Sequence, residues 1–299
     1  MVRRLYSFIV NKVSGNGRAF KIWRRVETLL QEKKLNYLVR FTKTAKHATL
    51  LAKELASRGD IKAIVAVGGD GTIHEVINGL AGSNIPLGVI PAGSGNDFCR
   101  NLEIPLRCER ALERILKHER KKIDIGRIND RYFGTVAGIG FDGKVADMIN
   151  RSSYKKLFNF VRLGGVSYIA GVMNVLWTYK PIDVQLTIDQ MPYHLTNVWM
   201  IAVANSRFYA GGMNICPEAD YHDGLFDICV VQHLTKMELI RMFPTVFSGR
   251  HIHHPSVNMF RGKEMEVLTE SPLMIHGDGE TIGQTPAKLT VEPDFLYVV

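Results

Sequence analysis

The chain has 299 residues, enough for one large domain or two ordinary ones, and its 46% hydrophobic content is that of a globular protein with a core. The apolar run at residues 5–10 is too short for a signal peptide, and residues 168–177 are about half of the ~20 needed to span a bilayer, so we expect a soluble protein. Lysine and arginine exceed the acids 38 to 29, which suits nucleotides, anionic membranes or nucleic acid as ligands without choosing among them.

The first 127 residues alternate between strand-like and helix-like segments. Strand-like runs are expected at residues 5–10, 37–41, 64–67 and 87–90, and helical patterns at residues 18–33, 45–58, from 72 onward and 109–117. This alternation predicts an α/β domain whose parallel sheet is flanked by helices. Ligands of such sheets bind beyond the carboxyl ends of the strands, so the loops there are the candidate site.

The pattern changes beyond residue 128. Helices are expected there at residues 145–150, 156–177 and 236–247, and antiparallel strands at residues 182–188, 198–205, 225–231, 257–260, 264–268 and 287–291. We therefore expect an α/β domain at residues 1–127, which carries the candidate site, and a mostly β domain at residues 128–287. Residues 288–299 are a candidate for completing the first domain.

The cysteines give no sign of a metal site or a disulfide framework. Cys99, Cys108, Cys216 and Cys229 lie far apart and form no C-x-x-C pair. This usage predicts a reduced, cytoplasmic setting.

The loop after the third predicted strand has the composition of a phosphate cradle. The glycines of GGDGT (residues 68–72) let backbone amides approach an anion, and Thr72 with Glu75 has the pattern of a capping box that starts a helix. The alternative is a tight, well-capped turn without a ligand. That alternative does not explain Asp70, because a carboxylate among phosphate-binding amides repels the ligand unless a metal ion intervenes. Asp70 therefore indicates a nucleotide bound with Mg²⁺.

Two further loops have the same character. PAGSGNDF (residues 91–98) either touches the same ligand or is a turn with Asn96 or Asp97 as a helix N-cap. NKVSGNGR (residues 11–18) supplies Lys12 and Arg18, which are candidate sources of positive charge. A helix dipole contributes only about 0.3 to 1 kcal/mol, whereas micromolar binding needs about 8 kcal/mol. Several loops are therefore expected to converge.

Six elements in the same order resemble the diacylglycerol kinase catalytic-domain family, the soluble bacterial lipid kinases related to sphingosine kinases. They are NKVSG, VGGDGTIHEVING, PAGSGNDF, KKIDIGRIN, NSRFYAGGMNICPEADYHDGLFDI and HGDGE, and they cover essentially the whole chain. GGDGT alone is also found in NAD kinases, but the six together are strongly specific. This chain has Ser94 where the family usually has Thr, and Lys12 where it usually has Pro.

The resemblance implies that Mg²⁺-ATP lies between the α/β domain and a β-sandwich domain. Its γ-phosphoryl group would pass to a lipid hydroxyl, with diacylglycerol as the expected acceptor and phosphatidic acid as the product. Thr42 also ends a predicted strand, which places it at this edge independently of the family. The residues implied around ATP are Asn11, Lys12, Val13, Ser14, Gly15, Thr42, Gly69, Asp70, Gly71, Thr72, Ile73, His74, Glu75 and Ser94.

The resemblance also implies the catalytic carboxylates. Asp70 and Asp124 would organise the catalytic metal or its waters, and one carboxylate of HGDGE, either Asp278 or Glu280, would take the proton from the lipid hydroxyl. The family points to Glu280 as this base. Taken alone, Asp278 and the glycine after it could equally form a plain hairpin turn.

A second, structural Mg²⁺ is implied at Asp220, Asp223 and the backbone carbonyl of Leu225, since oxygen ligands suit this cation. The alternative is that both aspartates are turn residues. The histidines within residues 251–254 lack a carboxylate at ligand spacing, so we expect solvated surface there.

A transient membrane contact is a further hypothesis. Lys155, Lys156 and Arg162 border an apolar helix that either packs in the core or meets the inner face of the membrane. Alternatives to the lipid kinase are an NAD kinase-like enzyme and a non-catalytic protein that binds nucleotides or anionic membranes. Nucleic acid is not an expected partner, because no aromatic and basic RNA-binding motif occurs. A homodimer is compatible with the family, and the acceptor lipid is not specified.

Overall fold

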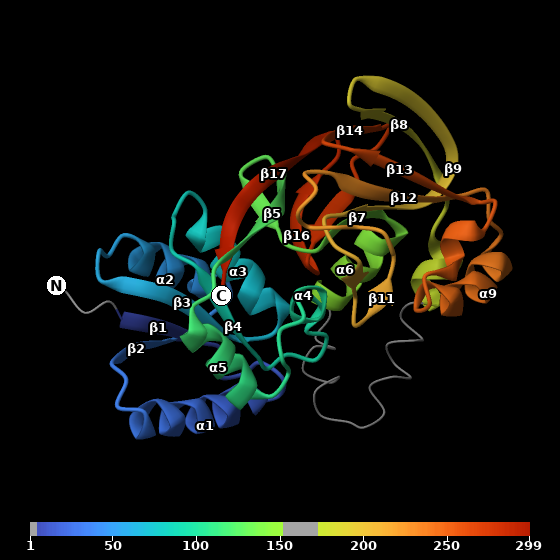
Figure 1. Cartoon of the computed structure of the whole chain (residues 1–299). Coiled ribbons are helices and arrows are strands. Elements are labelled where there is room, and N and C mark those ends of the chain that lie inside the picture. The colour runs from blue at the N-terminus through green and yellow to red at the C-terminus, as the bar shows by residue number, and fades with distance from the viewer. Residues whose placement is uncertain (1–4, 152–172) are drawn as a thin grey trace.

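The computed structural model describes residues 5–151 and 173–299. In its N-terminal half, β2, β1, β3 and β4 lie side by side in that order as parallel strands, with helices packed against them (Figure 1). The elements of this half are β1 (Leu5–Val10), α1 (Arg18–Glu32), β2 (Tyr37–Phe41), α2 (His47–Ala56), β3 (Ile61–Gly68), α3 (Asp70–Leu80), β4 (Leu87–Pro91), α4 (Asp97–Asn101), α5 (Cys108–Lys117) and β5 (Lys121–Ile128). The predicted α/β fold with a parallel sheet is confirmed.

The C-terminal half is rich in antiparallel strands, as predicted. Its elements are β6 (Arg131–Phe133), β7 (Val136–Gly140), α6 (Phe141–Arg151), β8 (Ile182–Ile188), β9 (Met191–Ala204), β10 (Phe208–Tyr209), β11 (Met213–Asn214), β12 (Phe226–Gln232), α9 (Lys236–Val246), the 3-10 helix η1 (Arg250–His253), β13 (Val257–Gly262), β14 (Glu264–Thr269), β15 (Met274–Gly277), β16 (Glu280–Gln284) and β17 (Ala287–Val298). Among the described residues, no helix is both long and apolar enough to cross a membrane.

The last strand connects the two halves. β17 pairs antiparallel with β14 and β5, and its end pairs parallel with β4 through Val298 and Leu87. The same strand therefore borders the C-terminal strands at its start and the parallel sheet of the N-terminal half at its end. The division into residues 1–127 with 288–299 and residues 128–287 stays a prediction.

One predicted helix falls largely outside the described residues. Of the span 156–177, only residues 173–177 are described, and they are helical. The membrane hypothesis for Lys155, Lys156 and Arg162 lies outside the described residues.

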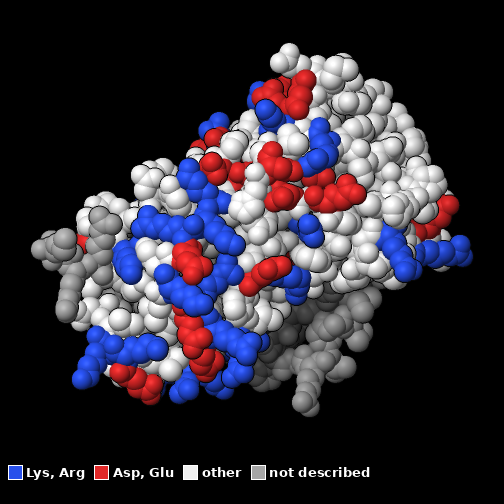
Figure 2. Space-filling view, in the orientation of Figure 1, with Lys and Arg blue, Asp and Glu red and all other residues white. Residues whose placement is uncertain are grey.

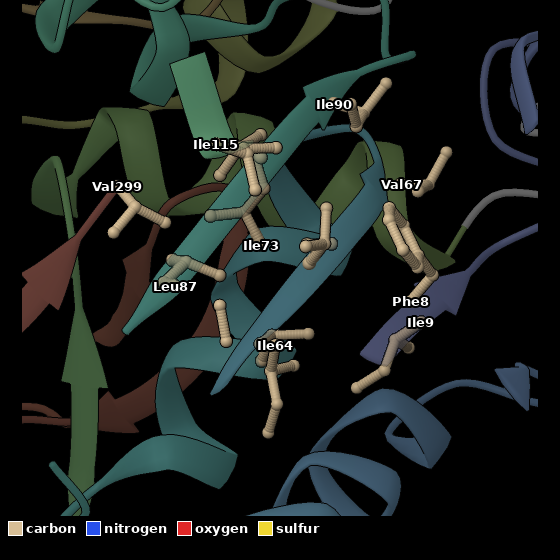
Figure 3. Packing of buried hydrophobic residues seen from close by; sticks show 14 of the residues in the cluster. Phe8, Ile9, Ile64, Val67, Ile73, Leu87, Ile90, Ile115 and Val299 are labelled. Carbon is tan, nitrogen blue, oxygen red and sulfur yellow. The ribbon is translucent and has the colours of Figure 1, made fainter. Parts of the chain in front are cut away.

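The core of the N-terminal half follows from its sequence pattern. β3 is an almost continuous apolar run and is buried along nearly its whole length, as expected for a parallel strand covered on both faces. α1 buries Trp23, Val26 and Leu30, which recur every three or four residues on one helix face. Figure 3 shows Ile64 and Leu87 of neighbouring strands within this apolar layer. A rigid sheet therefore supports the loops at its carboxyl edge.

Candidate active site

Three loops meet at the carboxyl edge of the parallel sheet. The amide of Ala92, after β4, donates to the carbonyl of Gly68, at the end of β3, over 2.8 Å. A Cβ on Gly69 would lie 2.8 Å from Cα of Gly93, and a Cβ on Gly15 would lie 2.3 Å from the Ala92 carbonyl oxygen. These glycines are needed because the backbones touch. The predicted convergence of the loops after β1, β3 and β4 is confirmed.

The residues expected around ATP differ in how exposed their side chains are to solvent. Val13 is 78% exposed and Ser94 is exposed, so both are accessible to a ligand. Thr42 follows β2 directly and donates its amide to the carbonyl of Val10 over 3.0 Å, which places it at the same edge. Ile73 and His74 have buried side chains on α3. The last two side chains therefore act through packing and positioning, and contact with ATP stays a prediction for the whole set.

The predicted capping box is wrong. α3 begins at Asp70, and its N-cap position, Gly69, receives no side-chain cap. The hydroxyl of Thr72 instead accepts a hydrogen bond from the Asn11 side chain over 3.0 Å. Glu75 accepts the amides of Lys46 and Ala48 over 2.8 and 2.9 Å, so it caps the start of α2. Thr72 and Glu75 thus bind neighbouring segments and do not cap their own helix. Both carboxylate oxygens of Glu75 are already engaged by amides.

The two candidate cations of the first loop lie in different places. The Lys12 ammonium is 4.1 Å from the ring centroid of Phe41 and 5.3 Å from that of Phe20. The Arg18 guanidinium lies over the loop itself, because a Cβ on Gly15 would be 3.3 Å from Arg18 Nε. Arg18 is therefore the cation that covers the glycine turn.

A pair of carboxylates lies where the GGDGT and PAGSGNDF loops meet. A Cβ on Gly95 would lie 3.0 Å from Asp70 Oδ2 and 3.2 Å from Asp97 Oδ2, so both oxygens face this glycine. Asp70 Oδ1 accepts the amide of Phe98 over 3.1 Å. Burial, together with the nearby Asp97, raises the pKa of Asp70 to about 6. A cation bound here would relieve this repulsion, and the donor set therefore fits Mg²⁺.

Sequence reasoning missed the position of Asp97. Its Oδ2 accepts the amide of Gly211 over 2.6 Å, and its Oδ1 pairs with Arg100. Asp97 thus connects the PAGSGNDF loop to the segment between β10 and β11. The Asn-Asp pair after a strand was the available signal, although it equally fitted a helix N-cap.

The HGDGE segment forms a tight hairpin turn between β15 and β16. Asp278 and Gly279 both have positive φ, at 54° and 82°, as a two-residue type I′ turn requires. The Asp278 carboxylate accepts four hydrogen bonds, from the amides of Gly134 and Thr135, the Thr135 hydroxyl and His74 Nδ1, over 2.6 to 2.9 Å. Burial alone would raise the pKa of the Asp278 carboxyl, but His74 and these donors outweigh it, so its pKa lies below the usual value. Asp278 is therefore a fixed anion that anchors the turn to α3.

Glu280 is the accessible carboxylate of this segment. It is the exposed first residue of β16, and a Cβ on Gly71 would lie 3.3 Å from Glu280 Oε1. The turn thus extends this carboxylate toward Gly71 in the first turn of α3. Of the two acids between which the sequence left the role of the base open, only Glu280 has oxygens available for substrate.

We expect Asp278→Asn to lower the free energy of unfolding by about 2 to 4 kcal/mol, because the amide group would face donors that now bind a buried anion. The folded-state pKa of Asp278 is depressed, so its contribution is present above about pH 4 and is lost as the pH falls through the folded value. Urea unfolding at pH 7.5 measures the loss. Asp130→Asn, in an exposed turn, is the matched control and should leave stability unchanged. Equal stability of the two variants would contradict the anchoring role.

Backbone amides engage both carboxylate oxygens of Asp124. Its carboxylate accepts the amides of Gly224 and Asp294 over 2.8 Å each, and its own amide donates to the carbonyl of Tyr221. Asp124 therefore connects β5 to the bulge of β17 and to the loop before β12. Its predicted role at the catalytic metal stays a prediction, with both carboxylate oxygens engaged by backbone amides.

The loop proposed for a structural Mg²⁺ makes its own contacts. Asp220 Oδ1 accepts the amide of His222, and Asp223 Oδ1 accepts the amide of Leu225, over 3.0 Å each. The other oxygen of Asp223 pairs with Arg261. Within residues 5–151 and 173–299, no three His, Cys, Asp or Glu side chains are arranged to hold a metal. The expected site uses two carboxylates and a backbone carbonyl, so the second Mg²⁺ stays a prediction.

An apolar cavity of about 640 Å³ opens from the carboxylate centre into the C-terminal half. One end is formed by Asp70, Gly95, Asp97, Asp278 and Gly279. Its apolar walls come from Phe141, Val145, Met173, Leu176, Met200, Met213, Ile215, Val231, Leu239, Ile240, Met242, Phe243 and Val246. A long apolar molecule would fit with a polar end at the carboxylates.

Two polar contacts interrupt the apolar wall. His276 Nε2 lies 2.9 Å from Asp142 Oδ2, and both side chains line the cavity. His251 is buried there, with Nε2 3.0 Å from the carbonyl of Ile215. The expectation that the histidine cluster is solvated surface is therefore wrong for His251, because η1 folds back against the cavity wall.

Comparisons with known proteins agree with this geometry. Residues 6–128 match the model of the diacylglycerol kinase catalytic domain, and residues 135–299 match that of the YegS C-terminal NAD kinase beta sandwich-like domain. A diacylglycerol kinase of Mycobacterium tuberculosis (strain H37Rv) is 33% identical, over 97% of this chain and 93% of that protein. The chain belongs to the diacylglycerol kinase family. A diacylglycerol kinase of Staphylococcus carnosus, another member, is 30% identical over 96% of this chain and 92% of that protein.

Solved structures show the same fold. A protein of Bacillus anthracis superposes on this member of the diacylglycerol kinase family with a TM-score of 0.79 at 25% identity, over 100% of this chain and 96% of that one. A crystal structure of a diacylglycerol kinase from the same organism gives a TM-score of 0.73 at 22% identity, over 99% and 96%. The family membership makes this protein a lipid kinase, and the resemblance stated from the six sequence elements is confirmed.

Proposed function

We propose that the protein transfers the γ-phosphoryl group of Mg²⁺-bound ATP to the hydroxyl of a diacylglycerol, giving phosphatidic acid and ADP. The observation that carries the proposal is the apolar cavity of about 640 Å³ that ends at Asp70, Asp97 and Asp278. Its walls suit acyl chains, and its polar end suits a hydroxyl beside a phosphoryl donor. An NAD kinase-like acceptor, which is polar throughout, has no comparable use for these walls.

The loops after β1, β3 and β4 are the proposed binding site for the triphosphate. Their glycines expose backbone amides beside the start of α3, where the helix dipole also favours an anion. Arg18 covers the first of these loops. Asp70 would hold Mg²⁺, which when bound neutralises charge on the phosphates. One or two carboxylates with phosphate oxygens and waters suffice for this ion, so a dedicated cluster of acids is not required.

Glu280 is the proposed base. Its carboxylate extends from the hairpin toward the first turn of α3, so it can accept the proton of a hydroxyl that enters from the cavity. That oxygen then forms a bond to the γ-phosphorus as the bond to the β–γ bridging oxygen of ATP breaks. Asp278 holds the hairpin in place through four hydrogen bonds and takes no proton in this scheme. Phosphoryl transfer needs chiefly alignment and charge neutralisation, which this arrangement provides.

The direct test supplies labelled ATP and Mg²⁺ with separate acceptors and identifies the products by mass spectrometry. Detergent-dispersed diacylglycerol, a sphingoid base, phosphatidylglycerol and NAD are compared at equal concentration. We expect phosphatidic acid as the main product. Labelled NADP in place of any phospholipid would favour the NAD kinase-like alternative, and no product with any lipid would favour a non-catalytic role.

A cavity-blocking substitution tests where the acyl chains lie. Ile240→Trp adds volume at a half-buried position of α9 that lines the cavity. We expect the KM for a long-chain diacylglycerol to rise about tenfold, which corresponds to about 1.4 kcal/mol, while the KM for ATP is unchanged. Leu50→Trp, on the exposed face of α2, is the matched control. An equal KM for the lipid in both variants would place the acyl chains elsewhere.

A further inference from the structure

Helix α9 presents an apolar stripe to solvent. Met237, Phe243 and Phe247 are 51%, 51% and 52% exposed. Phe243 and Phe247, the C-cap residue, are four positions apart and lie on one side of α9, and Met237 lies about a third of a turn round the helix from Phe243. The rings of Phe243 and Phe247 lie edge to face with centroids 5.8 Å apart. Trp177, 56% exposed, adjoins the start of the helix, since Lys236 Nζ lies 5.3 Å from its ring centroid. We call these four residues the α9 patch.

The α9 patch continues into the cavity. Leu239, Met242 and Val246, on the neighbouring side of α9, line the cavity wall. Phe243 belongs to both surfaces, because it lines the cavity and is half exposed. The cavity therefore reaches the surface at the patch, with the carboxylate centre at its other end. Figure 1 shows α9 at the end of the molecule remote from the parallel sheet.

Positive charge borders the α9 patch. Arg241 and Arg250 are exposed, and Lys236 is half buried against Trp177. The acid of this helix, Glu238, is engaged in the capping box with Thr235. Figure 2 shows Lys and Arg side chains at this end of the molecule, next to a smaller group of acidic side chains. Exposed aromatic and apolar side chains with basic residues beside them are the pattern of a surface that lies in a membrane interface.

We propose that the α9 patch docks on the surface of an anionic lipid bilayer, with α9 parallel to the membrane plane and the cavity mouth facing the lipid. The proposal rests on the function proposed above, because it makes the bilayer the source of the acceptor. A protein partner seated on the patch would cover the mouth through which that acceptor enters. The bilayer is therefore the occupant that the continuity of patch and cavity favours.

Vesicle flotation without ATP tests the docking separately from catalysis. The probes are vesicles of phosphatidylcholine with 25% phosphatidylglycerol and vesicles of phosphatidylcholine alone. We expect the unaltered protein to bind the anionic vesicles, and Met237→Glu with Phe247→Glu to weaken binding at least tenfold. Neither substituted residue lines the cavity. The control is Leu50→Glu with Leu106→Glu, which places the same charges at exposed leucines of the N-terminal half. Equal binding of the two double variants would overturn the proposal.

Tryptophan fluorescence gives a second readout that does not depend on acidic variants. Trp23 and Trp199 are buried at 1% and 2% exposure, so Trp177 is the solvent-exposed tryptophan. Insertion into the interface should shift the emission to shorter wavelength when anionic vesicles are added, and Trp177→Phe should abolish the shift. An unchanged spectrum of the unaltered protein with vesicles would contradict docking through this patch.

Kinase assays separate the docking from the proposed function. With a short-chain diacylglycerol below its critical micelle concentration, the Met237→Glu, Phe247→Glu variant should keep its activity within twofold, and with diacylglycerol in vesicles it should lose at least tenfold. If the unaltered protein phosphorylates the soluble acceptor but does not bind vesicles, the docking proposal is wrong and the proposed function is retained. Vesicle binding through the patch without phosphorylation of any lipid would overturn the function and leave the docking standing. A dimer that these substitutions dissociate, without vesicle binding, would identify a second copy as the occupant.

Discussion

Glu280→Gln is expected to lower kcat by about 10² to 10⁴ while the affinity for ATP stays within twofold. A positioned base typically accounts for this range of rate, and glutamine keeps the shape of the side chain but accepts no proton. The first turn of α3, which the carboxylate faces, keeps its own backbone hydrogen bonds in the variant, so the nucleotide loops should remain intact. Steady-state kinetics with diacylglycerol and calorimetric titration with ATP measure the two quantities.

The control for this variant is Glu270→Gln, which removes a carboxylate from the loop after β14, outside the cavity lining. Its kcat should equal that of the unaltered protein. A Glu280→Gln protein with near-normal kcat would remove Glu280 as the base. Loss of ATP binding in parallel with kcat would instead show that Glu280 holds the nucleotide or its metal.

The parallel sheet and its loops could be predicted because their signals are local. Apolar runs that feed into glycine-rich turns have few other uses, and the structure confirms that Gly69 and Gly93 must lack side chains for the loops to touch. The boundaries of β1 and β2 agree with the predicted segments. Where the chemistry depends on backbone geometry, a single sequence therefore carries most of the information.

Side-chain partners could not be predicted in the same way. Glu75 has the spacing of a capping box whether it bonds its own helix or a neighbour, and tertiary packing brought it to α2. The sequence around Asp97 is equally typical of a helix N-cap and of a ligand-binding loop, and the structure places its carboxylate near that of Asp70. β7 and β15 were missed because their short, glycine-containing sequences have weak strand patterns, and pairing with neighbouring strands stabilises them.

The apolar cavity had no sequence signal at all. Its walls come from the region before β8, from β9, from the β10–β11 segment and from α9, which are distant along the chain. His251 illustrates the difficulty, since a histidine close to the exposed His253 and the half-buried His254 has the composition of a surface loop yet is buried against Ile215. Only the fold shows that these segments enclose one volume.

Asp70→Asn is expected to lower kcat at least 10²-fold, since it removes the carboxylate proposed to hold Mg²⁺ between the nucleotide and the acceptor. Asparagine keeps an oxygen that can accept the amide of Phe98, so the fold of the loop should be retained. Activity as a function of Mg²⁺ concentration should also show a weaker apparent affinity for the ion. A variant with normal activity and an unchanged Mg²⁺ dependence would place the catalytic metal elsewhere.

The same substitution should stabilise the metal-free protein at pH 8. Burial and Asp97 raise the pKa of Asp70 from 3.8 to about 6 in the folded state. Below pH 3.8 the folded and unfolded states are both protonated, and as the pH rises to 6 the unfolded state loses its proton first, so stability falls. Above pH 6 the ionised, buried carboxylate lowers the free energy of unfolding by a constant amount, about 1 to 3 kcal/mol.

Urea unfolding in EDTA at pH 8 and pH 5 checks this stability gain. Asp70→Asn should unfold at a higher urea concentration than the unaltered protein at pH 8, and the difference should shrink at pH 5, where much of the cost is already relieved by protonation. Adding Mg²⁺ with ATP should stabilise the unaltered protein more than the variant, because the bound cation offsets the charge that asparagine lacks. A variant that is less stable at both pH values would show that the Asp70 carboxylate stabilises the fold. It would contradict the proposal that this carboxylate lowers the stability of the metal-free protein and is kept to bind a metal ion.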